Sequence, residues 1–262
     1  MYKFYSHIEK SNVGVALSAA LLSMALTPNF FNQIHWGIFI FSSVYSIYGA
    51  HRLIKWKYNQ LNSDWKKWHE EHHLVLIPIL ISQILLAASC WYFFVPITLN
   101  ITVVIIGTIT LMYVLPQPFL TLRSIPFIKA FIVALVWTFV LVILPAQIIK
   151  DFPSDILFKL AFFFYFLHLA ILSDIKDRNI DPASWKTFPT SFGVNKAIFS
   201  SFISVVIAFS LFVISSIDII GVLTGVLYLF SWYLLERKSW VNEHSYDSFL
   251  WILAVFLIFR FI

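Results

Sequence analysis

The sequence predicts an all-α polytopic membrane protein. Hydrophobic residues make up 60% of the chain, charged residues only 12%, and the mean hydropathy is +0.84. Soluble proteins average about 45–50% apolar and about 25% charged residues. The apolar residues form long continuous runs, which are typical of transmembrane helices; a membrane barrel would show short alternating strands. The chain is therefore expected to be an integral membrane protein.

Nine segments are long enough to cross a bilayer, and their lengths are close to the roughly 20 residues that a membrane-spanning helix needs. Proline and polar residues separate most of them. The chain has no internal repeat and no low-complexity tail, so we predict one domain over residues 1–262. The predicted spans are 12–30, 36–54, 74–94, 97–115, 127–147, 156–173, 197–215, 218–235 and 246–262.

The basic residues predict the orientation of these spans. With nine spans and a cytoplasmic N-terminus, only Lys150, Lys159 and Arg260 of the 18 Lys and Arg residues lie on the outer side. This asymmetry follows the rule that cytoplasmic loops are enriched in positive charge. We expect the inner membrane of a bacterium, with the N-terminus in the cytoplasm. Because the basic residues lie in short loops between apolar runs, the net charge of +5 does not indicate nucleic-acid binding.

Three aspartates follow the apolar run 157–172. Asp174, Asp177 and Asp181 stand at positions i, i+3 and i+7, which places their carboxylates on one helix face. Carboxylates are the ligands that Mg2+ prefers, usually together with substrate phosphates. Cations suited to an anionic substrate are expected around them: Lys176, Arg178 and Lys186 lie near them in the sequence, and Arg123 and Lys129 belong to another loop on the same predicted face of the membrane. The spacing alone is equally compatible with a solvated loop whose charges neutralise one another.

The residues that follow the aspartates point to a family. The run Asp174-x-x-Asp177-x-x-x-Asp181, followed by Lys186-Thr187-x-Pro189-x-x-x-Gly193, resembles the second aspartate-rich motif of the UbiA superfamily of intramembrane prenyltransferases. The segments Tyr113–Pro116 and Leu122–Lys129 are similar to the family's connection between helices four and five. The resemblance implies a bundle of nine transmembrane helices with its site on the cytoplasmic side. It also implies Mg2+-dependent transfer of a prenyl group from an isoprenyl diphosphate to a lipophilic acceptor.

The resemblance also implies roles for individual residues. Asp174, Asp177 and Asp181 would bind Mg2+ and act in catalysis. The leaving diphosphate would be stabilised by cationic side chains, namely Lys129, Lys186, Arg52 and Arg123. Aromatic faces stabilise carbocations, and Tyr48 and Tyr113 are the candidates because each lies at the cytoplasmic end of its predicted helix.

The region that should carry the family's first aspartate-rich motif, at the end of the second predicted helix, has no carboxylate before Asp64. It carries His51, Arg52 and Lys55 instead. Either Arg52, with His51, contacts the diphosphate in place of a bound metal, since guanidinium matches phosphate geometry, or the chain is a catalytically inactive UbiA-like protein that binds isoprenoid lipid or acts as an accessory protein. A transporter that uses the aspartates for ion passage is disfavoured, because such acids are expected near the membrane midplane.

Four further histidines lie in or beside the predicted spans. His69, His72 and His73 form an H-x-x-H-H pattern, but one such pattern cannot hold the two irons of a membrane desaturase. A mononuclear metal site together with His51 and an amphipathic interfacial segment over 64–71 are the two interpretations of this stretch. His168 lies within a predicted span, and we expect it to be a buried, hydrogen-bonded histidine rather than a catalytic base.

Overall fold

The computed structural model describes residues 11–27, 33–59, 61, 63–115, 122, 125–178 and 185–215. Within these ranges all regular structure is helical, which confirms the all-α prediction. The contacts divide the chain into two compact units, and each is described by itself. The first unit comprises Met1–Met24 and Asn29–Thr121, and the second comprises Ala25–Pro28 and Leu122–Ile262.

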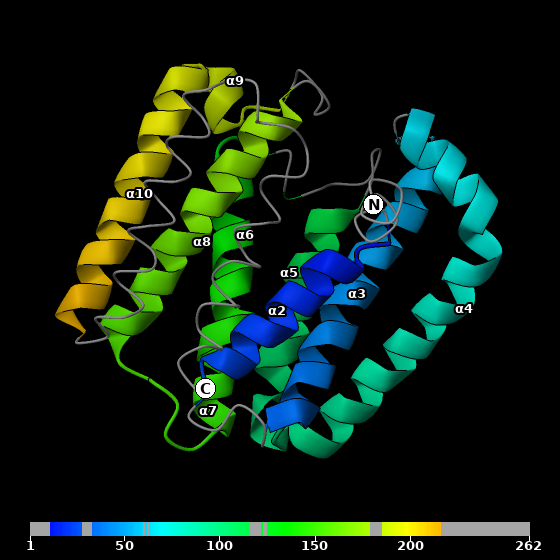
Figure 1. Ribbon diagram of the computed structural model, residues 1–262, viewed down its shortest axis with the longest axis horizontal. Coiled ribbons are helices and arrows are strands. Elements are labelled where there is room, and N and C mark those ends of the chain that lie inside the picture. The colour runs from blue at the N-terminus through cyan, green and yellow to red at the C-terminus, as the bar shows by residue number, and fades with distance from the viewer. Residues whose placement is uncertain are drawn as a thin grey trace, which may run out of the picture. The chain divides into compact units, whose positions relative to one another are not determined.

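The first unit is built around a helix pair. It contains α2 (Val13–Ala25), α3 (Ile34–Lys57), α4 (Ser63–Phe94), the short η2 (Ile97–Leu99) and α5 (Asn100–Val114). Helix α4 packs along α3, and α5 also contacts α3 (Figure 1). Helix α2 approaches α3 closely: the indole N–H of Trp36 donates a buried 2.7 Å hydrogen bond to the Ser23 hydroxyl. A Cβ at Gly37 would collide with the side chain of Met24, so a larger residue here would require that flexible side chain to move.

Helix α4 is longer than a membrane is thick. Its 32 residues span about 48 Å, whereas the hydrocarbon core is about 30 Å thick. The charged stretch 64–71 is thus the beginning of the spanning helix and not a separate segment lying in the interface. Pro78 stands inside α4, where its ring would meet the carbonyl of Leu74 in a straight helix. Figure 1 shows that α4 changes direction along its length.

The second unit is an antiparallel arrangement around α8. It contains α6 (Ile128–Thr138), the π-helical η4 (Phe139–Ile143), α7 (Leu144–Ile148), α8 (Ile156–Asp177), α9 (Phe188–Phe192) and α10 (Val194–Ile214). Helices α6 and α10 both pack against α8. The π-turn precedes Pro145 and contains Leu141, whose carbonyl the proline ring would meet in a regular α-helix.

Helix α8 has a defined beginning and a buried face. The Asp155 carboxylate accepts a 2.8 Å hydrogen bond from the Phe158 backbone N–H and caps the helix. The fully buried rings of Phe158 and Phe162 make edge-on contacts with Phe212 of α10. A polar contact joins the same two helices, because the Ser201 hydroxyl lies 2.7 Å from Nδ1 of the buried His168. This confirms that His168 is buried and hydrogen-bonded.

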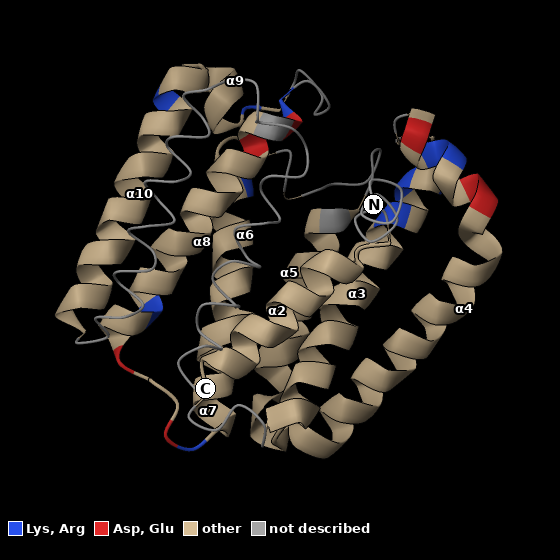
Figure 2. Ribbon diagram, viewed as in Figure 1, with Lys and Arg blue, Asp and Glu red and all other residues tan. Residues whose placement is uncertain are grey.

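Four helices of the described residues are long and apolar enough to cross a membrane, and the chain is an integral membrane protein. They are Ser63–Phe94, Ile128–Ile148, Ile156–Ile175 and Val194–Ile214. The apolar helices Val13–Ala25 and Ile97–Tyr113 are shorter. The predicted spans 218–235 and 246–262 lie outside the described residues, so nine spans and a single domain stay predictions. Figure 2 shows that the charged residues of α4 gather at its Ser63 end, as expected for a helix whose remainder lies in the bilayer.

Candidate functional site

The second unit joins two segments that the sequence singled out, through a buried ion pair. The ammonium of Lys129, in the first turn of α6, lies 2.8 Å from Oδ1 of Asp174 near the end of α8. The same ammonium lies 3.8 Å from Oδ2 of Asp177. The side chains of Lys129 and Asp174 are 5% and 2% exposed, whereas that of Asp177 is 32% exposed. Three charges thus share one end of the α6–α8 pair, and one of the two carboxylates faces outward.

The position of Lys129 is set by the backbone just before it. Phe127 has a left-handed conformation, with φ at 64°, which is unusual for a bulky residue. Its backbone N–H donates a 2.8 Å hydrogen bond to the carbonyl of Lys186. Its ring stacks on Phe192 at 5.3 Å and contacts Phe188 edge-on. The start of α6 is therefore tied to the segment 186–192 by a hydrogen bond and two ring contacts.

The Lys-Thr-x-Pro-x-x-x-Gly run has a local structural explanation. Thr187 is the N-cap of α9 and exchanges capping hydrogen bonds with Thr190, while Pro189 lies at the start of the helix, where its missing N–H is not needed. Gly193 joins α9 to α10 with φ at 84° and ψ at 159°, a conformation that is nearly restricted to glycine. The motif therefore encodes a tight helical corner beside the start of α6.

The structure describes some of the other predicted residues of this region and not the rest. The side chain of Lys186 is exposed and makes no ion pair within the described ranges, although its backbone carbonyl binds Phe127. Arg178 follows α8 and is also exposed. Asp181 and Arg123 lie outside the described residues, as does the side chain of Lys176. Lys129 and the aspartates 174 and 177 are the predicted residues that the structure brings together.

Asp174 and Asp177 differ in how well their carboxylates could bind Mg2+. Mg2+ is usually bound through one or two carboxylates together with phosphate oxygens and water. Asp177 is accessible and fits this pattern, whereas Asp174 is buried and holds an ammonium at contact distance. No group of three His, Cys, Asp or Glu side chains with metal-binding geometry occurs within the described part of the chain. A metal at this end would be held through Asp177 and substrate oxygens, with Asp181 as a further candidate.

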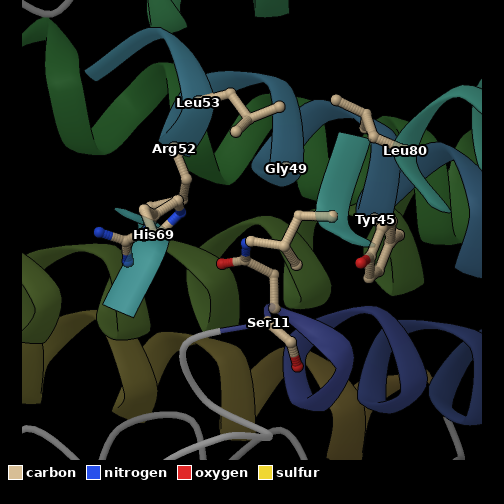
Figure 3. A pocket seen from close by; sticks show the side chains of 9 residues that line it. Ser11, Tyr45, Gly49, Arg52, Leu53, His69 and Leu80 are labelled. Atoms are coloured by element: carbon tan, nitrogen blue, oxygen red, sulfur yellow. The ribbon is translucent and has the colours of Figure 1, made fainter. Parts of the chain in front are cut away.

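Arg52, in the first unit, is a cation held in place by an aromatic ring. Its guanidinium carbon lies 3.8 Å from the ring centroid of Trp65, which joins the end of α3 to the beginning of α4. Arg52 also lines a small pocket together with the buried His69, while Tyr45 and Leu80 lie at the other side (Figure 3). This pocket has a volume of about 10 Å³, which is room for about one water. It is too small for a diphosphate in this conformation.

The other predicted residues of the first unit lie at the same two helix ends as the sequence suggested. Tyr48 and His51 are half-buried in the last turns of α3, and Tyr113 is half-buried in the last turn of α5. Each of the three makes further contacts.

The histidines of α4 are engaged with their own helix and with tryptophans. The Nδ1 atoms of His69, His72 and His73 donate hydrogen bonds to the carbonyls of Trp65, Trp68 and Glu70 at 2.8–2.9 Å. His72 stacks on Trp68 at 4.7 Å, and His73 stacks on Trp56 of α3 at 5.3 Å. Together with His51 they form no metal-binding group among the residues that the structure describes. The geometry favours an aromatic interface between α3 and α4.

Two contacts of the second unit were not anticipated from the sequence. From the sequence, Lys129 is predicted to be a diphosphate ligand and not a partner of Asp174. A lysine one residue inside an apolar helix was the available signal, because a buried ammonium requires a counter-charge. The left-handed Phe127 carries no such signal, since bulky residues rarely adopt that conformation.

Comparison of the chain with known protein families, curated proteins and solved structures gives no match.

Proposed function

We propose that the protein transfers a prenyl group from an isoprenyl diphosphate to a lipophilic acceptor within the membrane, with Mg2+ as cofactor. One observation carries the proposal. The segments that resemble the UbiA motifs are far apart in the sequence, yet they meet at one end of the second unit through the Lys129–Asp174 ion pair and the Phe127–Lys186 hydrogen bond.

The charges at this end suit an anionic leaving group. Mg2+, held through Asp177 and with Asp181 as a further ligand, would supply positive charge to the diphosphate oxygens. The exposed Lys186 and the buried Lys129 would add positive charge at the same end of the unit. Near the aspartates α8 carries the buried apolar side chains of Ile171 and Leu172, and such surroundings would protect an allylic carbocation from hydrolysis. The chain would lie in a bacterial inner membrane with this end facing the cytoplasm.

Arg52 is proposed to serve in place of the missing first acidic motif. Its guanidinium is planar, always charged and oriented by Trp65, and these properties suit a bidentate contact with phosphate oxygens. His51 belongs to the same turn of α3. Tyr48 and Tyr113 are the proposed aromatic side chains for the carbocation.

The test is diphosphate release. Purified protein in lipid nanodiscs is incubated with Mg2+, prenyl diphosphates of increasing chain length and a panel of aromatic and lipid acceptors. Asp177→Asn is expected to lower the release rate by at least about 100-fold, the usual scale for loss of charge stabilisation in a transition state. Asp151→Asn is the matched control: Asp151 is exposed at the opposite end of α8, and its left-handed φ of 63° is one that asparagine tolerates.

A second candidate follows from the same ion pair. A buried Lys–Asp pair is also what a structural salt bridge would provide in a catalytically inactive UbiA-like protein that binds isoprenoid lipid. Isoprenoid binding with no release from any donor, and with donor affinity unchanged by Asp177→Asn, would establish this candidate and exclude the transferase.

A further inference from the structure

The space between the two described carboxylates already contains a cation. The ammonium of Lys129 lies 2.8 Å from Asp174 and 3.8 Å from Asp177, and only 5% of the Lys129 side chain is exposed. The carboxylates stand at i and i+3 on α8, and the lysine reaches them from the neighbouring helix. A protein-borne positive charge therefore occupies the place that a metal would take between a pair of acids at this spacing.

Asp174 is poorly placed to bind a hydrated divalent metal as well as this ammonium. Its side chain is 2% exposed and its Oδ1 is in contact with Nζ at 2.8 Å, whereas Mg2+ usually keeps several of its waters. A metal at this carboxylate would also lie close to the ammonium in a buried environment, where screening is weak. Asp177 is different, because its nearer oxygen is 3.8 Å from Nζ and its side chain is 32% exposed.

The lysine is also fixed in place. It lies two residues after Phe127, whose backbone N–H is hydrogen-bonded to Lys186 and whose ring is packed against Phe192. The start of α6 is thus anchored on a different segment from the one that carries the acids. The geometry of the pair follows from the fold of the second unit and needs no metal to assemble it.

We propose that Lys129 is a built-in cation that replaces a divalent metal between Asp174 and Asp177, so that metal coordination at this cluster uses Asp177 and excludes Asp174. The inference rests on the proposed function, because that function is what requires a metal here. It assigns different roles to the charged side chains of Lys129, Asp174 and Asp177. Asp174 is a positioning residue that holds Lys129, and Asp177 is the metal ligand.

The test uses Mn2+ alone as the probe, measured by electron paramagnetic resonance on the full chain in nanodiscs. Lys129→Met leaves Asp174 and Asp177 without their internal cation. This variant is expected to bind Mn2+ at least about tenfold more tightly than the wild type, the usual scale for a change in a metal's surroundings. The gain should disappear in Lys129→Met/Asp174→Asn. Lys196→Met is the matched control, because Lys196 is an exposed lysine at the beginning of α10, the antiparallel neighbour of α8.

A second comparison decides the same question if Lys129→Met does not fold. In the otherwise unchanged chain, Asp177→Asn is expected to abolish Mn2+ binding, whereas Asp174→Asn keeps it, because asparagine retains an oxygen for Lys129. Equal loss of binding in the two variants would overturn the inference, and so would Lys129→Met binding Mn2+ as the wild type does. Absence of diphosphate release would overturn the transferase proposal and leave these binding results unaffected, so the two failures are distinguishable.

Discussion

Nζ of Lys129 lies 2.8 Å from Oδ1 of Asp174, and both side chains are almost fully buried. Removing one partner of a buried ion pair leaves an uncompensated charge, whereas removing both leaves none. This asymmetry leads to the first prediction.

Lys129→Met and Asp174→Leu are each expected to lower the free energy of unfolding by about 3–5 kcal/mol. The double variant should cost less than the sum, because it replaces the pair by two apolar side chains of similar volume. Reversible unfolding in mixed micelles measures all three variants. Additive losses would show that the two residues are not coupled.

Gly193→Ala is expected to lower the free energy of unfolding by about 1–3 kcal/mol, because φ at 84° with ψ at 159° is a region that alanine rarely adopts. No atom would contact the added Cβ, so the cost comes from the backbone alone. The control is Gly107→Ala in the middle of α5, where a Cβ also meets no atom. There alanine is expected to stabilise the helix by roughly 0.5–1 kcal/mol. Equal effects at the two positions would contradict the prediction.

Ser201→Ala should weaken the contact between α8 and α10, because it removes the hydroxyl that lies 2.7 Å from Nδ1 of His168. Hydrogen bonds between membrane helices are worth about 0.6–2 kcal/mol. Ser210→Ala on the same helix is the control, since its exposed hydroxyl binds only a carbonyl of its own helix, that of Val206. The unfolding free energies of the two variants are compared, and a cost at Ser210 equal to that at Ser201 would argue against an interhelical role.

Trp65 is expected to affect donor binding through Arg52. Trp65→Leu removes the ring beneath the guanidinium, a contact worth about 0.5–2 kcal/mol that favours the present orientation of Arg52. Under the proposed function this raises KM for the isoprenyl diphosphate, whereas Trp65→Phe keeps an aromatic face and changes KM less. Steady-state diphosphate release measures both variants. Identical KM values for the two would show that the stacking does not position Arg52 for the donor.

Several features of the helices follow from the sequence because they depend on local properties. Helix α8 was predicted at 156–173 and runs from Ile156 to Asp177, since it begins at the capping Asp155 and its aspartates continue the helical face. Helix α4 was predicted from residue 74, yet it begins at Ser63. Hydropathy marks only the part of a helix that lies in lipid, so it did not include the charged first turns of α4 in the predicted span.

The sequence singled out the residues of the candidate site, but it did not indicate which of these residues would contact one another. The spacing of Asp174 and Asp177 placed both on one face of α8, and the structure agrees. The sequence could not indicate that Lys129 would be buried against them, because that contact joins two helices more than forty positions apart.

By itself, the sequence determined that the chain is an α-helical membrane protein and that Asp174 and Asp177 follow an apolar run on one helix face. These properties depend on hydrophobic run length and on the spacing of residues within a helix. Only the tertiary structure decided which charged side chains form ion pairs. The left-handed Phe127 fixes the start of α6 against the 186–192 segment, and this anchoring brings the ammonium of Lys129 to Asp174 instead of leaving it in solvent.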